Sequence, residues 1–188
     1  MPKKIDHDAR RRGLAEALWR VLVARGLEAV SLRHVAAEAG VSMGMVQHYF
    51  SDKEEMVLFA LRSMTEHVSA RMGTALADLP DEPLRRVRAV LVEMLPLDDE
   101  RRVEAQVAAT FLAHAPVDPR VAEYLRAGYG EGHAYLAEQL GAAGVPDPGR
   151  AASLLLAVND GLTVHTLAGH LEPDEALAIL DEHLARFG

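Results

Sequence analysis

The feature that most constrains the fold is the stretch SLRHVAAEAGVSMGMVQHYF, in which two short helical patterns meet at a glycine. Ser31 is a good N-cap for the first pattern, whose apolar residues recur at helical spacing. Gly40 ends this pattern, because a residue without Cβ readily takes the left-handed conformation at a helix C-terminus. Ser42 caps the second pattern, in which Val46 and Phe50 (i, i+4) form the buried stripe. The stretch therefore predicts two short helices that cross at a steep angle, as in a helix-turn-helix.

The second helix of this pair has a distinct outward face, because its apolar residues must point toward the first helix. Met43 and Gln47 (i, i+4) lie on that face, with Gly44 and His48 beside them. The major groove of DNA admits such a helix, where a glutamine can pair with adenine and a methionine can contact a thymine methyl group. Tyr49 is expected to direct its hydroxyl toward a phosphate. The alternative is an ordinary corner between two packed helices. These outward residues have no role in such packing, so the pattern favours a DNA-reading element.

The net charge of −8 is unevenly distributed along the chain. Residues 1–53 hold nine Lys and Arg against six Asp and Glu, a net charge of +3, whereas residues 54–188 carry −11. A basic segment followed by an acidic remainder is typical of a DNA-binding domain joined to a domain that does not touch DNA. Helix N-termini favour phosphates, and the residues at or next to them in the basic segment are Ser31, Arg33, Ser42 and Lys53. We therefore expect a DNA-binding domain at 1–53 and a second domain at 54–188.

The rest of the chain shows helical periodicity and no sustained β-branched alternation, which predicts an all-α fold. The run Ser51-Asp52-Lys53-Glu54 predicts a capping box, with Ser51 as the N-cap of a long helix and Glu54 at N3. Asn159-Asp160-Gly161 has the composition of a hairpin turn, but both its flanks have helical period, so we place it inside a helix. Helices are expected at about residues 7–25, 52–79, 82–95, 98–115, 117–141, 147–169 and 173–187, besides the pair above.

Several classes of protein are disfavoured by the sequence. The chain has no cysteine, which excludes disulfides and thiolate metal sites, and neither a membrane-length apolar run nor a secretory signal is visible. A cytoplasmic protein is expected. Motifs for phosphate-binding loops or activated nucleophiles are missing, so we expect no enzymatic activity and no cofactor. His165 and His170 are five residues apart and would lie on different faces of a continuous helix, so no metal site is expected.

A small-molecule site is predicted in the second domain. Gln106, Thr110 and His114 recur at i, i+4 and i+8 beside apolar residues that include Phe111. A mostly apolar surface with a few convergent polar groups is what a ligand pocket requires. Candidates from neighbouring helices are His133, Asn159 and His165. The alternative is that each polar residue is solvated or satisfied within its own helix.

The last two predicted helices carry apolar stripes that could form a dimer interface. Such stripes could equally close the core of a single chain, but a terminal apolar helix pair on an acidic chain suits a homodimer. The candidate interface residues are Leu155, Leu162, Leu167, Leu177, Leu180 and Leu184.

The sequence resembles the tetracycline-repressor (TetR) family of bacterial regulators over about residues 8–60. The resemblance rests on an Arg- and Ala-rich first helix, then SLRHVAAEAGVS, MGMVQHYF, and SDKEEM at the start of a long helix. The segment DGLTVHTLAGHLEPDEALAILDEHL further resembles the betaine-regulator branch of the family. The family's DNA-contact positions correspond to Ser31, Leu32, Ser42, Met43, Gly44, Gln47, His48, Tyr49 and Lys53. Gln47 and His48 depart from the aromatic residues frequent in the family.

The resemblance implies an N-terminal helix-turn-helix domain joined by a long helix to a ligand-binding and dimerisation domain. It further implies a homodimer that binds a palindromic operator, and an effector that releases it. We therefore predict a repressor that responds to a small, largely apolar molecule. Two alternatives stay open at this point. The protein could be a DNA-binding dimer without a small effector, acting constitutively or through protein contacts, or it could be a helical enzyme or carrier whose corner is structural.

Overall fold

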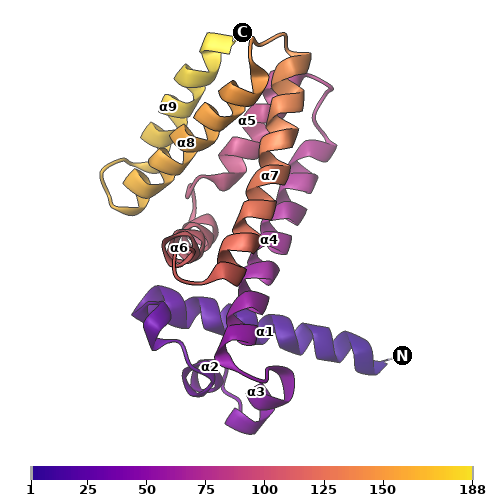
Figure 1. The fold of residues 1–188 in the computed structure, drawn as a ribbon, viewed down its shortest axis with the longest axis vertical. Coiled ribbons are helices and arrows are strands. Elements are labelled where there is room, and N and C mark those ends of the chain that lie inside the picture. Colours follow the sequence, from indigo (N-terminus) through magenta and orange to yellow (C-terminus); the bar gives the residue numbers. More distant parts are fainter. Residues whose placement is uncertain (1, 188) are drawn as a thin grey trace. The chain divides into compact units, whose positions relative to one another are not determined.

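A computed structural model describes residues 2–187, with the side chains of residue 7 and of residues 9–187 (Figure 1). The described part of the chain consists of helices joined by short turns and contains no strand, which confirms the all-α prediction. It divides into two compact units, the first running to His67 and the second beginning at Val68. None of its helices is both long and apolar enough to cross a lipid bilayer.

Unit 1 contains three complete α-helices and the first part of a fourth. They are α1 (Pro2–Arg25), α2 (Leu32–Glu38), α3 (Met43–Tyr49) and the N-terminal part of α4 (Lys53–Ala77), with a short 3₁₀ turn at Leu27–Ala29. The side chains of Met56 and Leu61 on α4 are buried, as are Leu14 and Leu18 on α1. The domain boundary predicted at residue 53 was based on the distribution of charge. The contacts in the structure instead group the first part of α4 with unit 1.

Unit 2 continues α4 and adds five α-helices. They are α5 (Pro83–Met94), α6 (Asp99–His114), α7 (Pro119–Ala142), α8 (Pro148–Leu167) and α9 (Pro173–Leu184), followed by a 3₁₀ turn at Ala185–Phe187. Four of these begin with a proline in the first turn, where its missing N–H costs no hydrogen bond. The core is formed mainly by leucines and valines of α5, α7, α8 and α9, and α8 packs against both α7 and α9 (Figure 1).

Local sequence signals explain most of the helix ends, with one shift in register. The prediction that Asn159-Asp160-Gly161 lies inside a helix is confirmed, because it falls within α8. The predicted capping box at the start of α4 is wrong by one residue. Asp52 is the residue that accepts a hydrogen bond from the backbone N–H of Glu55, at 2.7 Å, while the Glu55 carboxylate accepts from the N–H of Ser51, at 2.8 Å. The error arose because Ser51 and Asp52 are both good capping residues and each has a glutamate three positions later.

Candidate nucleic-acid interface

The turn between α2 and α3 is closed by a regular C-terminal motif. Gly40 has φ = 66°, the left-handed conformation that favours glycine. The N–H of Val41 then donates to the carbonyl of Ala36 at 3.0 Å, and the N–H of Gly40 donates to Ala37 at 3.3 Å. These two bonds define a Schellman motif, which brings the apolar side chains of Ala36 and Val41 together. The motif fixes the angle at which α3 leaves α2.

Both helices of the corner are capped by serine hydroxyls. The Oγ of Ser31 accepts from the N–H of His34, and the Oγ of Ser42 accepts from the N–H of Met45, each at 3.2 Å. A cap of this kind stabilises a helix by about 1 kcal/mol. Since α2 and α3 have seven residues each, they depend on such caps and on packing rather than on their own propensity.

The structure separates α3 into an inward and an outward face, as predicted from the spacing. Val46 and the following Phe50 are almost completely buried. Met43 is 46% exposed, and Gly44, Gln47 and His48 are exposed as well. Met45 is also exposed, although sequence reasoning did not single it out. The outward face therefore combines hydrogen-bonding groups with methionine side chains and carries no carboxylate, which suits contact with the edges of DNA bases.

An aromatic cluster borders this face. The ring of Tyr49 lies 4.5 Å from the ring of His7 and 5.3 Å from the ring of His48, measured between centroids. His7 belongs to α1 and was missed by sequence analysis, because no local pattern indicates which part of α1 approaches the end of α3. The cluster limits the freedom of the half-buried Tyr49 and adds a second imidazole beside it.

The remaining predicted contact residues differ in their surroundings. Arg33 is exposed, whereas Ser31 and Leu32 are partly buried. The ammonium group of Lys53 donates to the carbonyl of Leu27 at 3.2 Å, so its charge stabilises the 3₁₀ turn before α2. Any contact between Lys53 and a phosphate would have to be made alongside this bond.

Contacts from α1 hold the corner in place. The indole N–H of Trp19 donates to the carbonyl of Ala60 at 3.0 Å, and Arg11 lies over the ring of Phe59, 4.3 Å from its centroid. Arg20 donates to Glu38 of α2 at 2.7 Å. These interactions join α1 to α2 and α4, so that α3 presents its outward face from a supported frame.

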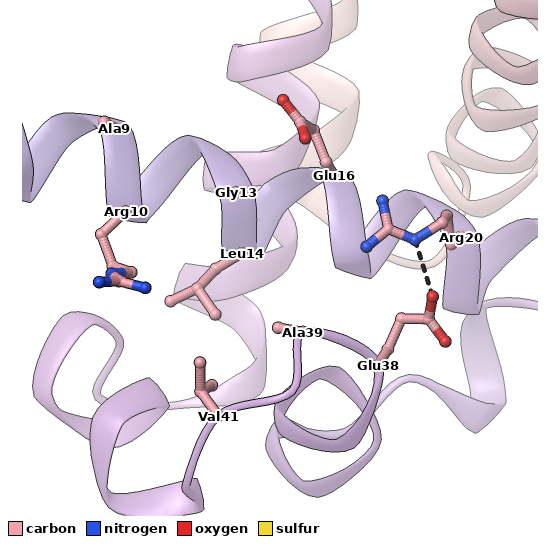
Figure 2. A pocket seen from close by; sticks show the side chains of 9 residues that line it. All are labelled: Ala9, Arg10, Gly13, Leu14, Glu16, Arg20, Glu38, Ala39 and Val41. Carbon is pink, nitrogen blue, oxygen red and sulfur yellow. Dashed lines mark hydrogen bonds and ion pairs between the residues drawn. The ribbon is translucent and has the colours of Figure 1, made fainter.

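A hollow of about 450 Å³ lies between α1 and the α2–α3 turn (Figure 2). Leu14 and Val41 point into it from opposite sides, and the Arg20–Glu38 pair stands at one end. The ligand site predicted from the sequence consists of residues on α6, α7 and α8, and none of them lines this hollow. We regard it as the space left where α1 crosses the turn.

Two models of known protein families match this chain, one in each unit. The model of bacterial regulatory proteins of the TetR family matches residues 14–59, and the model of the BetI-type transcriptional repressor C-terminal domain matches residues 83–188. The chain belongs to the TetR family. The resemblance inferred from sequence motifs is thereby confirmed, including its BetI-type C-terminal part.

Individual relatives of this TetR-family protein agree with the assignment. The regulator PksA of Bacillus subtilis is 43% identical over 116 residues, and BetI of Burkholderia thailandensis is 33% identical over 113 residues. These matches cover 61% and 60% of this chain, and only 56% of the length of each relative. A transcriptional regulator from Rhodococcus sp. Rha1 has 36% identity and a TM-score of 0.86, covering 94% of this chain and 95% of its own. A regulator from Saccharomonospora viridis, solved in complex with choline, shares the fold at 22% identity and a TM-score of 0.87, with 95% and 96% covered.

In unit 2 of this TetR-family protein, the residues predicted to bind a ligand have diverse environments. Thr110 donates its hydroxyl to the carbonyl of Gln106 at 2.8 Å, within its own helix. His133 lies at hydrogen-bonding distance from the carbonyl of Gly149 and the hydroxyl of Ser153. His165 is exposed, and its part in ligand binding stays a prediction. The partly buried His114 and the fully buried Phe111 fit the predicted stripe on α6.

Asn159 is the most unusual of the predicted ligand residues. Its side chain is 1% exposed, and neither its carbonyl oxygen nor its amide nitrogen has a hydrogen-bond partner among the described residues. The hydroxyl of Tyr135 on α7 is also buried without a partner in this part of the chain. Buried polar groups without partners are costly, and in proteins most of them are satisfied by a buried water or a bound molecule.

The residues predicted to form a dimer face on α8 and α9 differ in their exposure. Leu155, Leu162, Leu180 and Leu184 are already buried in the core of the single chain, so they have almost no surface to offer a second copy. Leu167 and Leu177 are only partly buried. The exposed large apolar residues of this helix pair are Leu154, Val164 and Ile179. Because both faces of α8 are apolar, the sequence alone could not indicate which of them lies in the core of the single chain.

Sequence analysis missed an ion-pair network in unit 2. The guanidinium of Arg71 on α4 forms two hydrogen bonds with Glu104 of α6, at 2.8 and 2.6 Å, and bonds Glu93 of α5 through both its carboxylate and its carbonyl. These interactions, chiefly the bonds to Glu104, raise the pKa of Arg71 above its ordinary value, against the opposing effect of burial. Arg71 therefore joins the end of α4 to two helices of unit 2. No spacing rule in the sequence indicates such a long-range contact.

Proposed function

We propose that this TetR-family protein is a transcriptional repressor that binds a palindromic operator as a homodimer. The observation that carries the proposal is the outward face of α3, which is exposed, free of carboxylates and anchored by two serine caps and a Schellman motif. In a two-fold dimer, two such helices reach successive major grooves about 34–36 Å apart. The basic character of residues 1–53 supplies the attraction to phosphates.

A stripe on α8 supports the proposed dimer. Leu154, Ala157, Gly161, Val164 and Ala168 follow one another at helical spacing, and all but the partly buried Gly161 are exposed. A Cβ added at Gly161 would meet no atom of its own chain within 4 Å. Small residues with open space above them allow a second helix to approach closely. We therefore assign the homodimer interface to this stripe and the exposed side of α9, rather than to the buried leucines.

We further propose that a small, largely apolar effector binds within unit 2 and lowers the affinity for operator. The proposal is supported by Asn159 and Tyr135, whose buried polar atoms lack partners among the described residues. The choline complex of the Saccharomonospora viridis relative is consistent with a small-molecule site in a protein of this fold. By linkage, operator DNA must weaken effector binding by the same factor by which effector weakens operator binding.

The experiment that tests DNA recognition compares two variants of α3. Sequences bound by the wild type are first selected from random duplexes. If Gln47 reads a base, Gln47→Ala should lose about 1–3 kcal/mol of affinity and relax the preference at one position in each half-site. Tyr49→Phe removes only a hydroxyl directed at a phosphate, so it should weaken all duplexes about equally.

Two results would contradict the proposal. One is the absence of any preferred sequence in the selection, or an affinity that does not fall as salt rises. The other is an equal, sequence-independent loss in Gln47→Ala and Tyr49→Phe, which would show that the outward face of α3 does not enter the groove. Leu112→Ala, on the exposed side of α6, is the control on the other unit, since it should leave both the affinity and the sequence preference unchanged.

A further inference from the structure

The C-terminus of α8 has an unusual composition at a common structural motif. Gly169 has φ = 74° and ends the helix in the left-handed conformation. The N–H of His170 donates to the carbonyl of His165 at 2.9 Å, and the N–H of Gly169 donates to Thr166 at 3.2 Å. These bonds define a Schellman motif, in which the residues flanking the turn, here His165 and His170, are brought into contact.

Two other helices of the chain end in the same motif and show what normally fills these positions. At the end of α2 the paired residues are Ala36 and Val41, and at the end of α7 they are Leu140 and Val145. Both pairs are apolar, as is usual for the motif. At the end of α8 the contact is instead between two exposed imidazoles, whose rings lie 5.3 Å apart. The motif there holds two imidazoles together instead of burying apolar surface.

The two imidazoles face each other through the same ring atom. The Nδ1 atoms of His165 and His170 are 3.0 Å apart. The expectation that these residues lie on different faces is wrong, because the helix ends at Leu167 and the chain turns back at Gly169. Two converging imidazole nitrogens can share one proton, or, with both protons on Nε2, they can direct two lone pairs at one cation. The negative end of the α8 dipole at the same place also favours a cation.

The separation of the nitrogens indicates which metal ions fit. For metal–nitrogen bonds of about 2.05 Å, two atoms 3.0 Å apart subtend an angle of about 94° at the metal. Neighbouring ligands in square-planar or octahedral coordination subtend about 90°, the geometry preferred by Cu²⁺ and Ni²⁺. A tetrahedral Zn²⁺ site, with an angle of about 109°, would require the nitrogens to move apart.

We propose that His165 and His170 form a two-histidine site for a divalent transition metal of the Cu²⁺ or Ni²⁺ type, bound through both Nδ1 atoms. Water molecules complete the coordination, because both side chains are exposed to solvent. The site is separate from α3 and from the buried Asn159, and the proposal does not depend on the proposed function. Cu²⁺ binds more tightly than Ni²⁺ or Zn²⁺, as in the general order for nitrogen ligands.

The test is calorimetric titration of the full chain, without an affinity tag, with Ni²⁺ in a buffer that does not bind metals. We expect a site that is lost in both His165→Gln and His170→Gln and kept in the control His183→Gln, which replaces a histidine on α9. Gly169→Ala provides a further test, because it keeps both imidazoles but strains the turn at φ = 74°. It should weaken Ni²⁺ binding without removing a ligand.

The outcomes separate the proposal from its alternatives. Unchanged Ni²⁺ binding in His165→Gln or His170→Gln would overturn the proposal, because the Ni²⁺ would then be bound at other residues. Loss of Ni²⁺ binding in His183→Gln as well would show that binding depends on the number of histidines and not on this pair. That result would also overturn the proposal. Wild-type binding by Gly169→Ala would refute the role of the turn. Imidazole ¹⁵N resonances that show a proton shared between the Nδ1 atoms, with no change on adding Ni²⁺, would assign the pair to a hydrogen bond alone.

Discussion

Arg71→Met should destabilise unit 2 substantially, because the guanidinium holds two carboxylates that have little access to water. The side chains of Glu104 and Glu93 are 7% and 12% exposed, and that of Arg71 is 21% exposed. Breaking a fully buried ion pair from one side costs about 3–5 kcal/mol. Since Arg71 itself keeps some contact with water, we expect the lower end of this range, about 3 kcal/mol. Methionine retains most of the length and the apolar stem of arginine, so packing changes little.

Arg88→Met is the matched control for burial. Arg88 of α5 also forms two hydrogen bonds with one carboxylate, that of Asp181 on α9, at 2.6 and 2.9 Å. The side chains are, however, 46% and 42% exposed, and an exposed pair of this kind contributes about 0–1 kcal/mol. Both substitutions therefore remove a two-bond guanidinium–carboxylate pair between helices. They differ in how far the pair is buried and in the additional bonds that Arg71 makes with Glu93.

The assay is urea unfolding of the full chain followed by two signals. The only tryptophan of the chain, Trp19, is in unit 1, so its fluorescence follows that unit, whereas far-UV circular dichroism follows all helices. Arg71→Met should shift the dichroism transition more than the fluorescence transition. Glu104→Gln added to Arg71→Met should recover part of the loss, because it removes a buried charge. Equal losses in Arg71→Met and Arg88→Met would refute the argument from burial.

Three further predictions concern single side chains. Gly40→Ala should lower the stability of unit 1 by about 1–2 kcal/mol, because φ = 66° strains a residue with Cβ. Urea unfolding followed by Trp19 fluorescence measures this loss. An unchanged unfolding midpoint would contradict the turn geometry. Gly161→Leu should leave the fold intact, since open space lies above Gly161, but should weaken dimerisation. Analytical ultracentrifugation measures the dimer dissociation constant, and an unchanged constant would place the interface elsewhere. Asn159→Leu should raise stability by about 1–3 kcal/mol by removing a buried amide without partners among the described residues. A fall in the thermal midpoint would show instead that a bound molecule satisfies this amide.

The helix-turn-helix could be predicted from the sequence because every signal in it is local. Ser31 and Ser42 cap the helices that follow them directly, and Gly40 allows the left-handed turn through its own backbone. The inward direction of Val46 and Phe50 follows from helical spacing alone. Even the one error, the capping box shifted from Ser51 to Asp52, is a local ambiguity between two adjacent capping residues.

The arrangement of side chains in unit 2 was beyond the reach of such signals. On α8, Leu155 and Leu154 are neighbours of identical chemistry, yet one lies in the core and the other at the surface. Which face of an apolar helix is buried depends on where α7 and α9 pack, and this is decided by the chain as a whole. The unpartnered amide of Asn159 is likewise visible only once its neighbours are in place.

The sequence by itself therefore determined the all-α class, the DNA-reading corner and the family, since these depend on spacing within a few helical turns. Only the tertiary structure decided which carboxylates Arg71 bonds, which stripe of α8 stays exposed and how His170 meets His165. The physical reason is the range of the forces involved. Caps, turns and periodicity act between residues close in sequence, whereas burial and side-chain pairing depend on helices that the chain brings together from distant positions.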